Sequence, residues 1–452
     1  MPHISASTRR SSLVARIGRA MQSHQRTIMA VQWLVVAVYF ILLLAPLALP
    51  ATEQSAHITN DLSHFAQFLL WGICWPLIML SMMFFGRIWC GVFCPDGTLT
   101  EFISRHGRKN SIPRWIRWPG WPLTMLVLTT IYGQLIGVYE FHLATLLLLG
   151  LPTMGALWVG FSYSNGKRVW CMYLCPANSV FAMLAKISPL HFRVDEEKWR
   201  RHPTPLPKID CPPLIDIRRM TSTSDCHACG RCSGYLGAVE LAVRSPETEI
   251  LTTKNAGTLE ANSLIFGVIG ICTAAMQWSG GDLFVWVKSL LVNFGFGALN
   301  QYALPWWLLA NHPDINRIFT LLDGLSILSC VMGGGALLGG VILGAVWLAA
   351  KLATIPELSW QKLSLTLIPI AGAGIFLGLS SLTLALLQAE GFALAWARYF
   401  QMVILAVGSL FSLWLGVRLI IRGISVRHFL ALILLVVPIA LLCASWVNKL
   451  FN

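Results

Sequence analysis

Long, uninterrupted apolar blocks limit most strongly what this chain can fold into. In the N-terminal half they lie at residues 31–50, 65–86, 119–138 and 143–163. Most are close to the ~20 apolar residues that a helix needs to cross a bilayer. They show no alternation of apolar and polar residues, which excludes a lipid-facing barrel. Only 12% of the residues are charged, against roughly 25% in soluble domains. We therefore predict an all-α polytopic membrane protein.

Further apolar blocks follow in the C-terminal half, and they set the number of crossings. They lie at residues 262–278, 319–350, 365–388, 397–421 and 427–447. Basic residues favour the cytoplasmic side, and the links near Lys351 and Arg422 are basic. Both links are inside if 279–317 stays outside without spanning. This predicts about nine transmembrane helices. A tenth over 284–309 would place one basic loop on the wrong side.

The same rule predicts the orientation of the N-terminal half. Residues 1–27 contain five arginines and no acid, and the loop at 105–117 and the pair Lys167/Arg168 are also basic. We expect the N-terminus, this loop and the segment after the fourth helix to be cytoplasmic. The formal net charge of +13 is thereby explained without nucleic acid as a partner.

The chain divides into four parts by composition. We predict a cytoplasmic basic N-terminus at 1–30 and a four-helix membrane module at 31–185. A polar segment at 186–261 is the only sizeable soluble stretch, and a C-terminal multi-helix membrane domain with the outer segment 279–317 occupies 262–452. Prolines at 203, 205 and 207 predict that the soluble segment begins as extended chain.

One short motif occurs twice, 81 residues apart. Residues 87–95 read Arg-Ile-Trp-Cys-Gly-Val-Phe-Cys-Pro and residues 168–176 read Arg-Val-Trp-Cys-Met-Tyr-Leu-Cys-Pro. Each copy follows the second helix of a predicted hairpin, at the cytoplasmic end. A repeated unit commonly means one structural unit used twice. The repeat is expected to bring four thiolates together.

A third cysteine cluster lies in the soluble segment, at Cys226, Cys229 and Cys232. Three cysteines at this spacing suit a cubane cluster, and the bacterial ferredoxin pattern adds a fourth cysteine followed by proline. Leu236 stands where that fourth cysteine would be, whereas Cys211-Pro212 is available upstream. Eight cysteines suffice for two [4Fe-4S] clusters.

The preferred ligand sets divide the eight cysteines into two quartets. The membrane-edge quartet is Cys90, Cys94, Cys171 and Cys175, and the soluble quartet is Cys211, Cys226, Cys229 and Cys232. An exchange that puts Cys94 or Cys175 on the soluble cluster stays open. Zinc, disulfides and inert thiols are the alternatives. Cytoplasmic disulfides are rare, and zinc favours two separated CxxC pairs. Four other cysteines, at 74, 272, 330 and 443, are expected to be small apolar residues.

These motifs resemble the NapH/NosR-type membrane polyferredoxins over residues 30–240. The marks are the two CxxxCP motifs after transmembrane hairpins and the ferredoxin-like stretch that follows. The resemblance implies a four-helix electron-transfer module in a bacterial inner membrane, with the cluster ligands named above. It implies partners among quinones, cytoplasmic donors and a redox protein. The C-terminal membrane half is not accounted for by it, and we find no flavin-attachment or periplasmic sensor domain.

Several other residues could serve a redox centre. His57, His64 and His142 could bind haem or quinone, but no convincing ligand pair supports either, and interfacial polar residues are the simpler interpretation. His227 is expected to be a solvated loop residue. Trp89 and Trp170 favour the membrane interface, and they could also shield a cluster. Arg87 and Arg168 could raise a cluster's potential or could serve only to set the topology.

The sequence therefore predicts one-electron transfer between a quinone or cytoplasmic donor and a redox partner in lipid surroundings. No side chain needs to act as acid, base or nucleophile, so an oxidoreductase component without its own catalytic residues is expected. A second hypothesis is an assembly, maturation or metal-reducing factor for a respiratory or metal enzyme. A third, a cluster-controlled transporter, ranks last because the C-terminal half has few intramembrane charges.

Overall fold

A computed structural model describes residues 6–48, 57–202, 209–220, 222–254, 256–279, 281–313, 317–421 and 425–451. The prolines at 203, 205 and 207, predicted to be extended, lie outside these residues. The chain forms two compact units and passes repeatedly between them. The first unit comprises Met1–Ile41, Ile78–Trp121 and Pro152–Glu249, and the second comprises Leu42–Leu77, Pro122–Leu151 and Ile250–Asn452. All eight predicted ligand cysteines belong to the first unit.

Eight helices in the described residues are long and apolar enough to cross a membrane. They are α2 (Gln25–Ala48), Leu62–Phe85, α7 (His142–Ser162), Thr258–Gln277, Leu321–Ala353, Trp360–Ala389, α19 (Ala397–Ile420) and α20 (Val426–Phe451). Each coincides with a predicted crossing, so the predicted fold class is confirmed. The crossing expected at 119–138 is α6 (Trp121–Leu135), which has 15 residues. At 1.5 Å per residue it is shorter than the ~30 Å hydrocarbon core.

Four of these spans change their helical geometry along their length. Three contain a π-helical stretch, and the fourth contains a short 3₁₀ turn. Their parts are α3 (Leu62–Gln67), η1 (Phe68–Cys74) and α4 (Trp75–Phe85); α12 (Thr258–Asn262), η5 (Ser263–Ile271) and α13 (Cys272–Gln277); α15 (Leu321–Leu328), η8 (Ser329–Gly333) and α16 (Gly334–Ala353); and α17 (Trp360–Ser364), η9 (Leu365–Leu367) and α18 (Ile368–Ala389).

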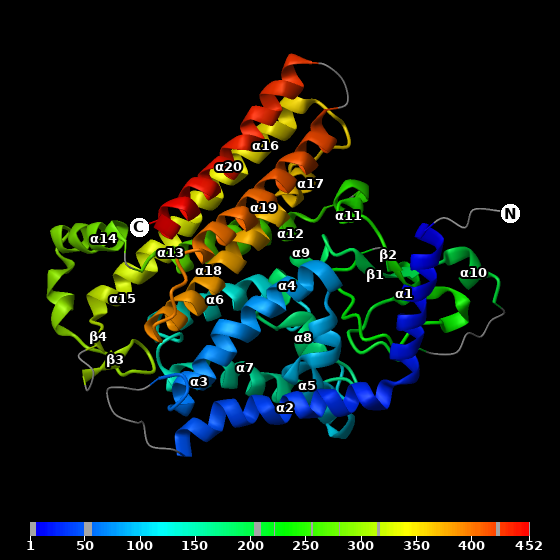
Figure 1. The fold of residues 1–452 in the computed structure, drawn as a ribbon, viewed down its shortest axis with the longest axis horizontal. Helices are drawn as coiled ribbons and strands as arrows, with labels where there is room; N and C mark the ends of the chain where they lie inside the picture. The colour runs from blue at the N-terminus through cyan, green and yellow to red at the C-terminus, as the bar shows by residue number, and fades with distance from the viewer. Residues whose placement is uncertain are drawn as a thin grey trace. The chain divides into compact units, whose positions relative to one another are not determined.

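The first unit adds short elements to the ends of its spans. Figure 1 shows α1 meeting the start of α2 at a sharp angle. The short elements are α1 (Ala6–Ser23), η2 (Trp89–Phe93), α5 (Pro95–His106), α8 (Val169–Tyr173), α9 (Asn178–Ala185), β1 (Leu190–Val194), α10 (Glu196–Arg200), η3 (Ile217–Arg219), η4 (Tyr235–Gly237) and β2 (Val239–Val243). The strands pair antiparallel, with Phe192 opposite Leu241. The helix α11 (Thr248–Thr252) follows.

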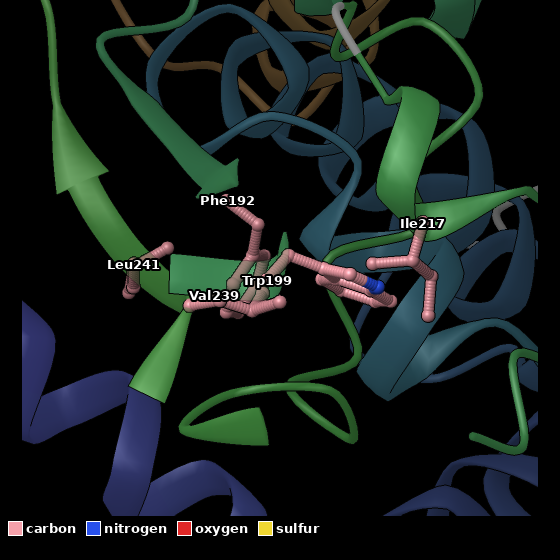
Figure 2. Close-up of a cluster of buried hydrophobic side chains, with 6 residues drawn as sticks. Phe192, Trp199, Ile217, Val239 and Leu241 are labelled. Carbon is pink, nitrogen blue, oxygen red and sulfur yellow. The ribbon is translucent and has the colours of Figure 1, made fainter. Parts of the chain in front are cut away.

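The soluble segment builds a small core of its own around Trp199. In Figure 2 the indole lies between Val239 and Ile217, with Phe192 and Leu241 completing the apolar cluster. Three of the predicted ligands, Cys211, Cys226 and Cys232, pack against this core. Burial of apolar surface is the main force that holds such a small segment together. The core therefore fixes the backbone that presents the soluble quartet.

The second unit is dominated by long helices. Contacts join α16 with α20, α18 with α19 and α19 with α20, and Figure 1 shows these helices running side by side. Within α16, Gly335 and Gly339 pack closely against η5, whereas Gly340 and Gly344 face open space. The segment predicted to stay outside contains α14 (Asp282–Asn293), η6 (Phe296–Gln301), β3 (Asn311–His312) and β4 (Arg317–Ile318).

Candidate metal centre

The first CxxxCP copy sits in a tight turn between two helices. After α4 the chain turns at Gly86, whose φ of +65° suits glycine, and then enters the π-helical turn η2. Cys90 is buried within η2, and Cys94 ends it with extended backbone geometry. Pro95 starts α5. Proline is favoured at the first position of a helix because an N–H group there would have no partner within the helix. The proline thus redirects the chain directly after the second thiol.

The second copy places its cysteines on a different local structure. Cys171 is buried within the short helix α8, which ends at Tyr173, and Cys175 follows directly after the C-cap residue Leu174. The amide of Cys175 donates to the carbonyl oxygen of Trp170 at 2.9 Å. The corresponding bond in the first copy runs from the amide of Cys94 to the carbonyl oxygen of Trp89, also at 2.9 Å. The two copies therefore share one five-residue loop closure, as the repeated sequence predicts.

The third cluster wraps its cysteines in left-handed turns. Ala228, Gly230 and Gly234 all have positive φ values, between +47° and +78°. Such turns reverse the chain over a few residues, so that Cys226, Cys229 and Cys232 come close to one another. Cys211 is held at the edge of this loop, where the Lys167 amine donates to its carbonyl oxygen at 3.0 Å.

The four membrane-edge cysteines lie close enough together that thiolates within the set raise the pKa values of Cys94 and Cys175. Burial raises the pKa of Cys175 to about 12, and the neighbouring Cys90 thiolate raises it further. Burial also raises the pKa of Cys94 well above its ordinary value. The thiolates that add to this effect on Cys94 are those of Cys171, Cys90 and Cys175. All four cysteines of this set therefore lie within mutual electrostatic range.

The pKa values of cysteines in the soluble quartet are likewise raised by burial and by neighbouring thiolates. Burial raises the pKa of Cys226 to about 12 and also raises that of Cys232. The thiolates that act on Cys232 are those of Cys226, Cys229 and Cys211. The structure thus brings together Cys211 and the three loop cysteines, although 15 residues separate Cys211 from Cys226.

The chemistry of these two sets fits an iron–sulfur cubane. Buried thiols with raised pKa values ionise only when cations offset their charge. Within the described part of the chain, no three His, Cys, Asp or Glu side chains lie close enough to hold a single metal ion. A cubane needs less convergence, because its four thiolates bind four different irons around a shared core. Each quartet brings four thiols within mutual electrostatic range, which is consistent with this requirement.

Two buried arginines connect the motifs. Arg87 and Arg168 are 2% and 1% exposed, and each starts one of the repeats. The Arg87 guanidinium lies 3.8 Å from Cys90 Sγ and donates to Asn178 Oδ1 at 2.6 Å. That asparagine follows the second copy, so Arg87 braces one copy against the other. Its third partner is the carbonyl oxygen of Ser224, two residues before Cys226.

Arg168 makes the reciprocal connections. Its guanidinium donates to the carbonyl oxygen of Cys90, and its amide donates to the carbonyl oxygen of Pro212 at 2.8 Å. The charges that act on it include the thiolates of Cys171 and Cys229, one from each quartet. The two arginines therefore join all three cysteine motifs. Whether they also raise a cluster's potential stays a prediction.

Glu101 is a site residue that the sequence did not reveal. Its carboxylate, on α5, accepts from Arg168 Nε at 3.0 Å, from Arg231 Nη2 at 2.7 Å and from Arg105 Nη2 at 2.8 Å. Burial opposes its charge, but Arg168 and Arg231 hold its pKa below the ordinary value. One carboxylate thus ties the first copy's helix to the second copy and to the soluble loop. An isolated Glu in a helix carries no sequence signal for this role.

Backbone contact also joins the first copy to the soluble loop. A Cβ on Gly91 would lie 2.1 Å from the carbonyl oxygen of His227 and 2.8 Å from the amide nitrogen of Cys229. Two side chains of α2 bond to this junction. Gln32 Nε2 donates to the carbonyl oxygen of Gly91 at 2.8 Å, and Gln25 Nε2 donates to that of Cys229 at 3.1 Å. Only glycine fits at position 91.

The structure corrects the prediction for His227 and sharpens that for Trp170. His227 is 1% exposed, so it is not a solvated loop residue. It is buried because the third loop packs on Gly91 rather than facing water. Trp170 is 5% exposed, and its ring packs against Gly155 of α7. Trp170 thus packs inside the protein as part of the second copy, whereas Trp89 stacks on Phe93 within the first copy.

The three other histidines make local bonds within the second unit. His57 contacts Glu390 at 3.1 Å, His64 lies 3.5 Å from Asp61, and His142 Nε2 lies 2.9 Å from the carbonyl oxygen of Leu43. These bonds fit the interpretation as interfacial polar residues. Haem or quinone binding by these residues gains no support from their contacts.

Comparison with known proteins identifies the repeat. Residues 67–113 and 147–195 each match the family model of a 4Fe-4S binding domain. The matches contain the two CxxxCP copies, and they support iron–sulfur clusters as cofactors. The cysteines of the soluble quartet lie outside them. No solved structure matches this chain.

Two curated proteins are similar to parts of the chain. "Putative electron transport protein YccM" of Escherichia coli (strain K12) is 23% identical over 241 residues, covering 44% of this chain and 64% of YccM. "Regulatory protein NosR" of Pseudomonas aeruginosa is 25% identical over 135 residues, covering 25% of this chain and 19% of NosR. The chain thus spans less than two thirds of the length of either relative. These similarities confirm the resemblance predicted from the doubled motif.

Proposed function

We propose that this chain is a membrane-bound electron-transfer protein that holds two [4Fe-4S] clusters. The observation that carries the proposal is the gathering of eight cysteines into two sets of four within one compact unit. The membrane-edge quartet is assigned Cys90, Cys94, Cys171 and Cys175, and the soluble quartet is assigned Cys211, Cys226, Cys229 and Cys232. Bound there, the clusters would supply one-electron redox chemistry.

The protein's own part in this function is to hold, shield and connect the two sites. Cys90 and Cys171 are buried, Trp170 is buried within the second copy, and the Trp199 core packs against three cysteines of the soluble quartet. Arg87 and Arg168 place fixed positive charge beside thiolates of both sets. Contact at Gly91 keeps the two loops adjacent. The printed name of YccM as an electron transport protein agrees with this role.

The location and the partners are part of the same proposal. The resemblance to the membrane polyferredoxins favours a bacterial inner membrane, and the basic loops favour the cytoplasmic side for the N-terminus and both quartets. Electrons would be exchanged with a quinone or a cytoplasmic donor and with a redox partner protein.

Metal analysis tests the cluster content. Anaerobically purified protein should contain about eight iron atoms and about eight acid-labile sulfides per chain, because each cubane carries four of each. Its visible absorption should bleach on reduction. Zinc at one or two per chain, without a bleachable absorption, would overturn the proposal.

Labelling in intact cells tests the orientation. Reporter cysteines placed singly at Ser55, Ser245 and Ser279 are treated with a membrane-impermeant thiol reagent and compared with the parent protein. Ser55 and Ser279 positions should label, whereas the Ser245 position should stay protected until the membrane is opened. Labelling at Ser245 in intact cells would place the quartets outside and contradict the cytoplasmic arrangement.

A further inference from the structure

We infer that His227, although it stands within the motif of the soluble quartet, serves the other quartet: its imidazole N–H donates a hydrogen bond to a sulfur of the membrane-edge cluster and raises that cluster's potential. The inference rests on the proposed function, since it needs a cluster at Cys90, Cys94, Cys171 and Cys175. It assigns His227 as a positioning and tuning residue, not as a ligand.

The first argument is the unsatisfied imidazole. His227 is 1% exposed, and neither Nδ1 nor Nε2 has a hydrogen-bond partner among the described residues. Buried polar groups nearly always have a partner, because an unpaired N–H loses its bonds to water without replacement. A group that the protein buries without a partner points to an acceptor that the polypeptide itself does not provide.

The second argument is the charge around the ring. The guanidinium groups of Arg87 and Arg168 are the charged groups that act on the imidazole. An imidazole carries at least one N–H donor, whether it is neutral or protonated. Guanidinium groups only donate, so neither arginine can accept that N–H. Sulfide and thiolate sulfurs are the acceptors that a bound cluster would add.

The third argument is that both of these arginines contact Cys90 of the membrane-edge quartet. Arg87 lies 3.8 Å from Cys90 Sγ, and Arg168 donates to the carbonyl oxygen of Cys90. The main chain of His227 packs on Gly91, the residue after Cys90. Both arginines that act on the ring thus contact Cys90, and the main chain of His227 packs on the first copy, which favours the membrane-edge quartet as the acceptor. Cys226 and Cys229, on either side of His227, are assigned to the soluble quartet. Hydrogen bonds to cluster sulfurs are an established means of raising the reduction potential.

Electron spin-echo spectroscopy with labelled histidine tests the bond directly. Protein grown with ¹⁵N-histidine is reduced, and the signals of the two clusters are assigned with Cys94→Ser and Cys229→Ser. The membrane-edge cluster should show a weak nitrogen coupling that changes with the label and is absent in His227→Leu. His202→Leu is the matched control, because His202 is an exposed histidine of the same segment that bonds the carbonyl oxygen of Leu236.

Redox titration provides a second readout. In His227→Leu the potential of the membrane-edge cluster should fall by about 59 mV, a tenfold change in the ratio of reduced to oxidised protein for one electron. His227→Asn keeps an N–H donor and should recover part of this loss. The soluble cluster should move less in both variants.

The outcomes separate this inference from the proposed function. Protein without iron would overturn the proposed function. Protein with both clusters but no histidine coupling at the membrane-edge cluster would overturn the inference alone, as would a coupling confined to the soluble cluster. Because the coupling is measured in the unmodified protein, the inference is tested even if His227→Leu does not fold.

Discussion

The two CxxxCP copies have nearly the same sequence and different surroundings. Cys90 lies in a π-helical turn and Cys171 in a short α-helix, yet both loops close with the same backbone bond. The first copy carries Gly91 and is covered by the backbone of the soluble loop, whereas Met172 stands at the equivalent position of the second copy. The comparison teaches that the repeat specifies thiols and loop closure, while single non-repeated residues specify the neighbours.

Cysteine substitution should have the largest effect. If substitutions in the two copies give different results, the two copies do not contribute equally to one cluster. Cys94→Ser and Cys175→Ser should each remove the membrane-edge cluster and about half of the iron, because a cubane is held by four thiolates. Cys229→Ser should remove the other half. Iron content and low-temperature spin resonance measure both. If Cys94→Ser instead halves the signal that depends on Cys229, ligands are exchanged between the quartets.

Loss of Glu101 should have the next largest effect, because this carboxylate joins the two copies. Glu101→Gln leaves Arg168 buried without its counter-ion, and breaking such a pair costs about 3–5 kcal/mol. The free energy of unfolding of the detergent-solubilised protein measures the change. The matched control is Glu240→Gln, which removes an exposed partner of Arg193 and should cost less than about 1 kcal/mol. Equal losses in the two variants would contradict the assigned role.

The same residue predicts a dependence on pH. The folded-state pKa of Glu101 is lowered, so its stabilising effect is complete above the unfolded value of about 4.3 and is lost as the pH falls through the folded value. Acidification below about pH 4.3 should therefore narrow the difference in stability between the wild type and Glu101→Gln. A difference that grows on acidification would have the wrong sign.

The position that distinguishes the copies should show a smaller effect. Gly91→Ala would push a methyl group into the backbone of residues 227–229. The shifts that such overpacking forces should lower the free energy of unfolding by about 1–3 kcal/mol. Thermal unfolding and cluster content measure it, with loss expected first from the soluble loop. Met172→Ala changes the equivalent residue without a clash and should retain both clusters. If both variants behave alike, the asymmetry between the copies has no structural consequence.

Much of this organisation could be predicted from the sequence, for physical reasons. A helix that crosses the lipid needs a continuous apolar sequence, so the membrane spans could be predicted from the sequence, apart from the short α6. Cysteine spacing is set by the cluster that the thiols hold, and the doubled motif was therefore readable as well. The surroundings of Arg87, Arg168 and His227 could not be predicted, because they depend on contacts between residues 44 to 137 positions apart. Glu101 and Gly91 carry no local pattern at all, and only the folded chain shows what they touch.

The close approach at Gly91 has a consequence for how this region can diverge among homologous sequences. A side chain at position 91 can be accommodated only if the chain at 227–229 moves away, so the two positions should vary together. Sequences with a bulky residue at 91 should have a longer or differently spaced third cysteine loop, whereas those with glycine should keep the spacing of Cys226, Cys229 and Cys232. The glycine at position 91 therefore restricts the length of the loop at 227–229, which lies more than 130 residues away in the sequence.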